Sequence, residues 1–282
     1  MVVVQGDTTT TMAGALAAFY RHTPVAHVEA GLRTGDLAHP FPEELNRVMT
    51  SRIADLHFAP TERARGNLLA EGIALEQVFI TGNSGIDALF HVVNGLEQGR
   101  LQGEEFPWID PARKLVLVTA HRRENFGDGI ERICDAIAEL ARRDDTQVAY
   151  PIHRNPKVLG PVTERLGGLP NVVLLPPFDY RAFVDLMRRA YLVITDSGGI
   201  QEEAPSLGKP VLVLRQSTER PEAVDAGTVE LVGDDPARIL AAAVRLLTDE
   251  TAYRRMSRMH NPYGDGRAAE RIVRHIVERV RG

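Results

Sequence analysis

The sequence predicts an α/β protein built on doubly wound parallel sheets. Short apolar runs alternate with helical stretches over most of the 282 residues, as in successive βαβ units. The clearest unit runs from the apolar strand Leu192–Thr195 through a turn of small residues and a helix to a second strand, Pro210–Leu214. Polar residues fall at the ends of several predicted strands, where doubly wound proteins build their sites.

In the first part of the chain the predicted strands are Met1–Val4, Val25–Val28, Leu56–Ala59 and Val78–Thr81. The helices expected between them are Met12–Arg21, Glu43–Arg52 and Glu62–Glu71. These strands are fewer than the ~5–6 of an average sheet. We therefore expect a domain at residues 1–90 that is incomplete at its amino end.

The start of the chain is itself a continuous apolar run, and Val2–Val4 is typical of a strand buried on both faces. A strand of this kind with an uncovered edge invites aggregation. Each large apolar side chain left uncovered forfeits about 1.5–3 kcal/mol. The sequence thus predicts poor solubility, protection from proteolysis mainly after Ala112, and little activity of the chain as written.

The stretch from His91 to Arg113 is irregular and is expected to connect two domains. The strands predicted beyond it are Leu115–Thr119, Gln147–Ile152, Val172–Leu175, Leu192–Thr195, Val211–Leu214 and Thr228–Val232. The helices predicted there are Gly129–Ala141, Arg181–Arg189, Ile200–Leu207, Pro236–Thr248 and Ala252–Met259. This gives a second domain at residues 112–266. The last helix, residues 267–282, carries one apolar stripe and is expected to pack back on the first domain.

Composition excludes several classes of function. The net charge of −5 provides no electrostatic footprint for nucleic acid, and the dispersed basic residues form no membrane-binding patch. No apolar run approaches the ~18 residues that span a bilayer. Cys134, the only cysteine, cannot form an internal disulfide and is expected to be a small buried residue. These features predict a cytoplasmic protein.

The turn after Leu192–Thr195 is the strongest candidate for a binding site. Its residues Asp196, Ser197, Gly198 and Gly199 lie at the start of a helix, where free N–H groups and the helix dipole suit a phosphate. One turn further on, Glu202 and Glu203 could accept hydrogen bonds from sugar hydroxyls. The alternative is that Asp196 or Ser197 only caps the helix.

Three carboxylates of the first domain are candidates for acid–base chemistry. Asp7 and Glu29 follow predicted strands, and Glu43 follows Pro42 at a helix start. Asp7 could instead cap the next helix, and Glu43 with Glu44 could serve only the helix dipole. At Glu29, which precedes Gly31, a purely structural role is harder to find.

The second domain places His121, Arg122 and Arg123 directly after a predicted strand, and His153 follows another. Paired arginines suit anions, although a solvated surface and a turn histidine are the plainer interpretations. The sequence has no D-x-D metal motif, no zinc-like His/Cys spacing and no P-loop. The glycines at 264 and 266 are not preceded by a strand, so they do not indicate a dinucleotide site.

The segments that carry these residues read QGDTTTTMAGALAAFY, HVEAGLRTGD, PFPEELNR, FITGNSGIDAL, VTAHRRENFG, YPIHRNP, TDSGGIQEEAPSLGKPVLVLRQSTERPEA and NPYGDG. Together they resemble the non-hydrolysing UDP-N-acetylglucosamine 2-epimerases over nearly the whole chain. The resemblance implies a GT-B-like fold of two Rossmann-like domains with the sugar nucleotide in the cleft between them. It implies interconversion of UDP-N-acetylglucosamine (UDP-GlcNAc) and UDP-N-acetylmannosamine (UDP-ManNAc), with no NAD and no catalytic metal.

In the mechanism that the resemblance implies, anti elimination of UDP gives 2-acetamidoglucal, and syn addition returns UDP on the opposite C2 epimer. Asp7, Glu29 and Glu43 are then the acid–base candidates, and His121 stabilises the leaving diphosphate. The residues implied to bind substrate are Phe178 near the uracil, Ser197, Gly198 and Gly199 at the phosphate, Glu203 at the ribose and Arg220 at the diphosphate.

The resemblance also implies a homodimer, a role in cell-surface polysaccharide synthesis, and a second UDP-GlcNAc that activates the enzyme. Arg122 and His153 match positions of that allosteric site. Relative to the family pattern, the chain is expected to lack an amino-terminal strand and a basic loop that meets the diphosphate. Two alternatives stay open: a GT-B glycosyltransferase, and an inactive UDP-sugar-binding fragment.

Overall fold

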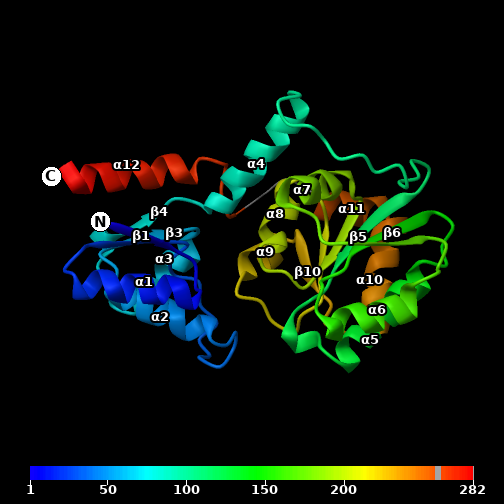
Figure 1. Cartoon of the computed structure of the whole chain (residues 1–282), viewed down its shortest axis with the longest axis horizontal. Helices are drawn as coiled ribbons and strands as arrows, with labels where there is room; N and C mark the ends of the chain where they lie inside the picture. Colours follow the sequence, from blue (N-terminus) through cyan, green and yellow to red (C-terminus); the bar gives the residue numbers. More distant parts are fainter. Residues whose placement is uncertain (258–261, 282) are drawn as a thin grey trace. The chain divides into compact units, whose positions relative to one another are not determined.

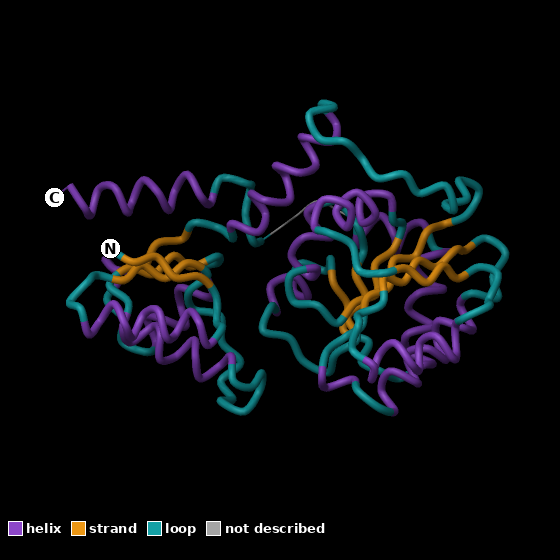
Figure 2. Tube along the Cα trace, in the orientation of Figure 1, coloured by secondary structure: helices purple, strands orange, loops and turns teal. Residues whose placement is uncertain are grey.

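The computed structural model describes residues 1–257 and 262–281 and divides the chain into two compact units. Unit 1 comprises Met1–Phe90 with Pro262–Gly282, and unit 2 comprises His91–Asn261. Each unit is an α/β structure around a parallel sheet, so the predicted fold class of Rossmann-like domains is confirmed (Figures 1 and 2). The predicted helix ends at Met259 and Gly282 lie outside the described residues.

Unit 1 has a four-stranded sheet in the order β1-β2-β3-β4. Its strands are β1 (Val2–Gln5), β2 (Val25–Val28), β3 (Leu56–Ala59) and β4 (Val78–Ile80). Its helices are α1 (Thr9–Tyr20), α2 (Glu43–Ile53), α3 (Glu62–Ala70) and α12 (Ala268–Arg281), with a 3-10 turn at Leu75–Gln77. Helix α4 (Ser84–Glu97) begins in unit 1 and continues past Phe90 into unit 2. Because the strands are parallel and consecutive, the segments that follow β1 and β2 emerge side by side at one edge of the sheet.

Helix α12 lies on one face of this sheet, and α1, α2 and α3 lie on the other (Figure 1). Ile272 of α12 packs on residues of β2 and β3, and His275 stacks on Phe79 with 4.1 Å between ring centroids. The start of α12 is fixed by Asp87 of α4, whose carboxylate accepts hydrogen bonds from the backbone N–H groups of Ala268 and Ala269 at 3.0 and 2.8 Å. The final helix therefore forms part of the core of unit 1.

The expectation that Val2–Val4 is buried on both faces is wrong for Val3, which is 53% exposed. Val4 faces α1 and is buried with Ala15 and Ala18. Val3 points to the opposite face, where the apolar stripe of α12 covers β2 and β3 instead. A continuous apolar run predicts burial on both faces only where a helix lies over each of them.

The prediction of irregular structure over His91–Arg113 is wrong for its first seven residues, because α4 continues to Glu97, and is confirmed for residues 98–113, which contain no helix or strand. Ile86, Leu89 and Val93 of α4 are buried at helical spacing. Gly95 interrupts that pattern in the sequence, but it permits close packing: a Cβ there would lie 2.6 Å from Leu101.

Unit 2 has a six-stranded parallel sheet in the order β10-β9-β8-β5-β6-β7. Its strands are β5 (Lys114–Thr119), β6 (Thr146–Pro151), β7 (Val172–Leu175), β8 (Leu192–Thr195), β9 (Val211–Val213) and β10 (Val229–Leu231). Its helices are α5 (Asp128–Leu140), α6 (Pro156–Leu166), α7 (Tyr180–Arg189), α8 (Ile200–Ser206), α9 (Pro221–Asp225), α10 (Pro236–Thr248) and α11 (Glu250–Met256), with a 3-10 turn at Arg123–Asn125. Helices α5, α6 and α10 cover one side of this sheet (Figure 1).

The sequence did not predict α6, which contains Pro161 and begins at Pro156. Proline is compatible with the first helical turn, and Asn155 caps this helix by accepting from Lys157 N–H. Val158, Val162 and Leu166 then bury one stripe of α6 in the core, beside Cys134 of α5. Burial raises the pKa of the Cys134 thiol to about 12, as expected for a packing residue.

The strand order of unit 2 reverses between β5 and β8. From β5 the chain proceeds to β6 and β7 on one side, whereas β8 leads to β9 and β10 on the other. Thr119 and Thr195 are partners in the register at the ends of these strands, and their hydroxyls lie 2.7 Å apart. Doubly wound proteins bind ligands at such a switch point, which here lies between the predicted His121 loop and the 196–199 turn.

Candidate active site

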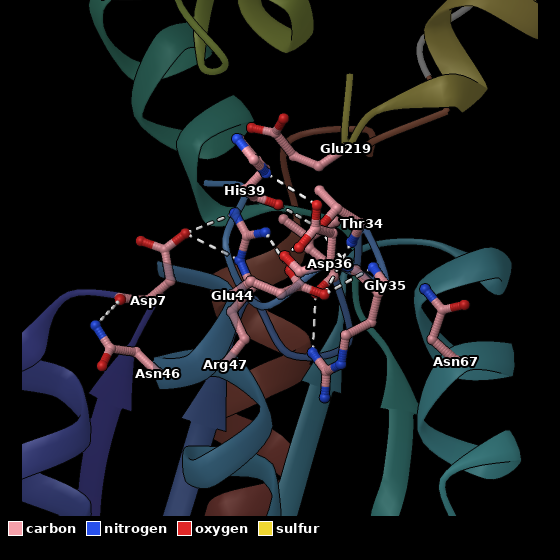
Figure 3. Close-up of polar contacts among 12 residues, drawn as sticks. Asp7, Thr34, Gly35, Asp36, His39, Glu44, Asn46, Arg47, Asn67 and Glu219 are labelled. Carbon is pink, nitrogen blue, oxygen red and sulfur yellow. Dashed lines mark hydrogen bonds and ion pairs between the residues drawn. The ribbon is translucent and has the colours of Figure 1, made fainter. Parts of the chain in front are cut away.

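Asp7 lies two residues beyond β1 and is bound by helix α2. Its Oδ2 accepts two hydrogen bonds from Arg47, from Nε at 3.1 Å and from Nη2 at 2.7 Å, and its backbone carbonyl accepts from Asn46 at 2.8 Å (Figure 3). The cap of α1 is Thr8, so the alternative that Asp7 caps this helix is wrong. The described residues donate no hydrogen bond to Oδ1, and the carboxylate is 30% exposed. Asp7 is thus oriented through one oxygen while the other stays free for chemistry.

Glu29 follows β2 directly and has a left-handed backbone, with φ of 64°. Its carboxylate lies against the turn after β1, since a Cβ on Gly6 would stand 3.6 Å from Glu29 Oε2. The neighbouring His27 is fully buried on β2, and its Nε2 donates to the Gly6 carbonyl at 2.9 Å. The structure therefore brings the segments of Asp7 and Glu29 together, and a non-glycine residue held at positive φ is a typical feature of functional sites.

Glu43 and Glu44 begin α2, but their environments differ completely. Glu44 is buried and accepts hydrogen bonds from the backbone of Thr34 and Gly35 at 3.0 Å each and from Arg47 at 2.9 Å (Figure 3). It therefore ties the loop after β2 to the arginine that holds Asp7. Glu43 is half-buried, and the described part of the chain provides no ion pair for it. At three and four residues before Asn46 and Arg47, Glu43 shares their helix face.

In unit 2, the 196–199 turn does not work as a simple helix cap. Helix α8 has Gly199 at its N-cap with no side-chain cap bond, so the alternative that Asp196 or Ser197 caps it is wrong. Asp196 instead accepts from the backbone N–H groups of His121 and Arg122 at 2.8 Å each, which joins this turn to the loop after β5.

Arg220 lies against the same turn at Gly198. A Cβ on Gly198 would stand 2.6 Å from the guanidinium, so a larger residue there would displace Arg220. Arg220 is buried and pairs with Glu202 and Glu219. Glu219 also pairs with Arg215 at 2.9 Å. The network fixes the guanidinium beside the turn, where it can bind an anion in a single orientation.

Glu203 accepts a hydrogen bond from the hydroxyl of Tyr180 at 2.9 Å. Burial raises the pKa of Glu203 to about 7, with a smaller contribution from the charge of Glu202, while the Tyr180 hydrogen bond opposes the shift. Phe178 lies two residues before Tyr180, and its ring meets Phe106 edge-on at 5.8 Å. The Tyr180–Glu203 hydrogen bond links the segment of Phe178 to helix α8, and an aromatic ring together with a hydrogen-bonding carboxylate suits a nucleoside.

His121 and His153 stack with ring centroids 5.4 Å apart. Burial lowers the pKa of His121, and the charges of His153 and Arg122 act in the same direction, whereas Asp196 opposes them. Within residues 1–257 and 262–281, no group of three His, Cys, Asp or Glu side chains could hold a metal ion. Over the same residues, no helix is long and apolar enough to cross a membrane.

Sequence reasoning missed several residues that organise these sites: His27, Glu44, Arg47, Tyr180 and Asp196 as a loop anchor. Arg47 lies 40 positions from Asp7, and Asp196 lies 75 from His121, so no local pattern links them. A usable signal was the pair of opposite charges, Glu44 and Arg47, on one face of helix α2, and the structure buries this face.

The family model described as UDP-N-acetylglucosamine 2-epimerase matches residues 1–277. A UDP-N-acetylglucosamine 2-epimerase of Yersinia pestis is 56% identical over 281 residues, which cover 98% of this chain and 75% of the relative. The enzyme of that name from Escherichia coli K12 is 57% identical over 278 residues, which cover 97% and 74%.

Solved structures agree with these sequence matches. The crystal structure of UDP-GlcNAc 2-epimerase from Neisseria meningitidis bound to UDP-GlcNAc has a TM-score of 0.94 at 48% identity, over 98% of this chain and 76% of the other. The Methanocaldococcus jannaschii enzyme in complex with UDP-GlcNAc and UDP has a TM-score of 0.82 at 36% identity, over 98% and 75%.

Proposed function

Since this chain belongs to the UDP-N-acetylglucosamine 2-epimerase family, we propose that it interconverts UDP-GlcNAc and UDP-ManNAc. It removes UDP from the sugar and then adds UDP back, which gives the opposite C2 epimer. The observation that carries the proposal is the match over residues 1–277. The alternative of a GT-B glycosyltransferase gains no support, because the family model and the relatives described above carry the epimerase name.

Unit 1 supplies the proton transfers in this proposal. A carboxylate removes the proton from C2 while the bond from C1 to the diphosphate oxygen breaks, and the electron pair forms the C1–C2 double bond of 2-acetamidoglucal. A proton then returns to the other face of C2 as the diphosphate oxygen attacks C1. Proton removal from one face of C2 and proton return to the other require more than one acid–base group. This requirement favours the set of Asp7, Glu29 and Glu43. Asp7 offers its free Oδ1 while Arg47 orients the group.

Unit 2 binds UDP in this proposal. The 197–199 turn and Arg220 hold the phosphates, His121 donates to the leaving diphosphate, Glu203 accepts from ribose hydroxyls and Phe178 lies at the uracil. Support comes from the guanidinium fixed beside Gly198 and from the pKa of Glu203, which is about 7. Ribose hydroxyls that donate to this carboxylate favour its ionised form, so bound UDP lowers that pKa. No NAD or metal enters the scheme.

Further parts of the proposal follow from the family resemblance. Arg122 and His153 contribute to a site for a second, activating UDP-GlcNAc; the protein is a cytoplasmic homodimer, and its product serves cell-surface polysaccharide synthesis. The stack of His153 on His121 supports a link between the activating site and the diphosphate site. Dependence of UDP-ManNAc turnover on added UDP-GlcNAc tests the activator, and sedimentation tests the dimer.

The decisive experiment is epimerisation in deuterated water, followed by NMR of the product. We expect deuterium at C2 of UDP-ManNAc, because the proton there exchanges with solvent on the carboxylate. Unlabelled product would contradict elimination, and UDP binding without turnover would favour the UDP-sugar-binding alternative. Calorimetry with UDP, UDP-GlcNAc and NAD supplies the control, since tighter binding of NAD would contradict the assigned ligand.

A further inference from the structure

Asp196 is a fully buried carboxylate whose two oxygens have very different environments. Oδ2 accepts three hydrogen bonds: from the backbone of His121 and Arg122 at 2.8 Å each, and from the Asn125 side chain at 3.0 Å. Oδ1 is buried too, yet no described residue forms a hydrogen bond with it. A buried charged oxygen without a partner is costly, so this one calls for an explanation.

The group that could donate a hydrogen bond to that oxygen is the imidazole of His121, whose Nδ1 lies 3.7 Å from Oδ1. This is beyond hydrogen-bond distance but within the range of a strong electrostatic interaction. The His121 side chain is 40% exposed, so its ring has room to turn. A small rotation toward Asp196 would form an Nδ1–H···Oδ1 hydrogen bond, and Nε2 would remain as the nitrogen available to a ligand.

The second imidazole of the stack is not equivalent. Nδ1 of His153 accepts a hydrogen bond from the backbone N–H of Asn155 at 3.1 Å, which requires that nitrogen to be unprotonated. His153 therefore has no free position for a proton on Nδ1, whereas His121 has a carboxylate facing its own Nδ1. The other charged group beside His121 is Arg122, which disfavours a positive imidazole. Among these groups, Asp196 alone favours a proton on His121.

We propose that Asp196 is the positioning residue of His121: through Oδ2 it fixes the loop that carries the histidine, and through Oδ1 it holds Nδ1–H. This keeps His121 ready to take a proton on Nε2 when an anionic diphosphate binds. The inference rests on the proposed function in one respect, the assignment of the diphosphate as the group that meets His121. The arrangement of carboxylate and imidazole itself lies wholly within unit 2.

The substitution Asp196→Asn separates the two roles. An asparagine can place its carbonyl oxygen where Oδ2 lies and keep the three donors, while its NH₂ group replaces the charge facing His121. We expect the pKa of His121, followed by NMR of ¹³Cε1-labelled histidine, to fall by about 1 unit or more. In the unmodified protein, UDP should raise this pKa, and in the variant the rise should be smaller. The His121→Gln spectrum identifies the resonance.

Asp145→Asn is the matched control. It removes the same charge from unit 2, but Asp145 precedes β6, at the opposite edge of the parallel sheet from Asp196. The His121 titration should be unchanged in this variant. An unchanged titration in Asp196→Asn, or an equal shift in both variants, would overturn the proposal.

A measurement on the unmodified protein covers the case in which Asp196→Asn fails to fold. The ¹⁵N shifts of neutral His121 should report the proton on Nδ1, and a proton on Nε2 alone would overturn the proposal. These readouts need no substrate. If His121 behaves as expected but UDP leaves its pKa unchanged, the assigned contact with the diphosphate is wrong, and the Asp196–His121 pairing still stands.

Discussion

Unit 1 and unit 2 share one architecture, a parallel sheet with helices, but the candidate carboxylates of unit 1 and the candidate arginine of unit 2 differ in how completely their charges are paired. In unit 1 the candidate carboxylates Asp7, Glu29 and Glu43 are all partly exposed, and Asp7 is held through one oxygen only. In unit 2 the candidate Arg220 forms a closed set with Glu202 and Glu219, all of them buried.

The difference is the one that the two halves of the proposed reaction require. A proton-transfer group must reach its substrate and change charge, so it cannot have both oxygens saturated. A group that binds a permanent anion gains from being fixed in advance, because no reorganisation is then needed. The comparison therefore predicts that substitutions in unit 1 act on turnover, and that substitutions in unit 2 act on UDP binding and local stability.

The largest effect is expected for the unit 1 carboxylates. Asp7→Asn, Glu29→Gln or Glu43→Gln should each lower kcat by about 100-fold or more if the residue transfers a proton. UDP affinity, measured by calorimetry, should be nearly unchanged because the proposal assigns UDP binding to unit 2. The control is Glu62→Gln, which removes an exposed carboxylate of unit 1 at the start of α3. Near-normal turnover in all three variants would contradict the assignment.

Acid should destabilise unit 1 before unit 2. Burial lowers the pKa values of His27 and His57 to about 4, whereas an unfolded histidine has a pKa of about 6.5. The unfolded chain thus takes up these protons first as the pH falls from 6.5 to 4, and stability is lost across that window. Each histidine accounts for about 3 kcal/mol of the unfolding free energy that is lost across this window.

Glu203 of unit 2 contributes a pH dependence of stability with the opposite sign. Burial raises its pKa in the folded protein to about 7, so the stability that it costs at neutral pH is regained as the pH falls toward its ordinary pKa of 4.5. Hydrogen exchange at pH 7 and pH 5 should therefore show lost protection in β2 and β3 but not in β8. His22→Gln, at an exposed histidine, is the control. Equal loss in both units would refute the comparison.

A smaller effect is expected at the glycines of unit 2. Gly198→Ala should displace the Arg220 guanidinium and lower stability by about 1–3 kcal/mol, as overpacking does. Gly199→Ala is matched to it, because Gly199 has helical φ of −63° and open space around its Cβ position. That change should leave the melting temperature unchanged or slightly raised. Equal melting temperatures for the two variants would show that Arg220 is not fixed by this packing.

The smallest effect is expected at the face of β1 that α12 leaves uncovered. Val3→Thr should change the free energy of unfolding by less than about 0.5 kcal/mol, because Val3 is 53% exposed. Val4→Thr, next to it, places a hydroxyl in the buried cluster with Ala15 and Ala18 and should cost more. Urea unfolding of the pair measures the difference, and equal costs would mean that Val3 is covered in solution.

Most strands were predictable because buried parallel strands are continuous apolar runs between turns, and β2, β3, β7 and β8 have the predicted bounds. Helices α4 and α6 were missed because glycine and proline within them argue for loops. At Gly95 the close approach of Leu101 outweighs propensity, and at Pro156 the first turn accepts proline. Propensity is a local quantity, and packing overrides it.

The sequence by itself determined the fold class, the family resemblance and the placement of Asp7, Glu29 and His121 at strand ends, because all of these depend on order along the chain. Only the tertiary structure decided which oxygen of Asp7 is paired and which oxygen of Asp196 is not. It also decided the depressed pKa values of His27 and His57, because the cost of charging a group depends on what surrounds it. Hydrogen-bond partners 40 and 75 positions apart become neighbours only when the sheets form.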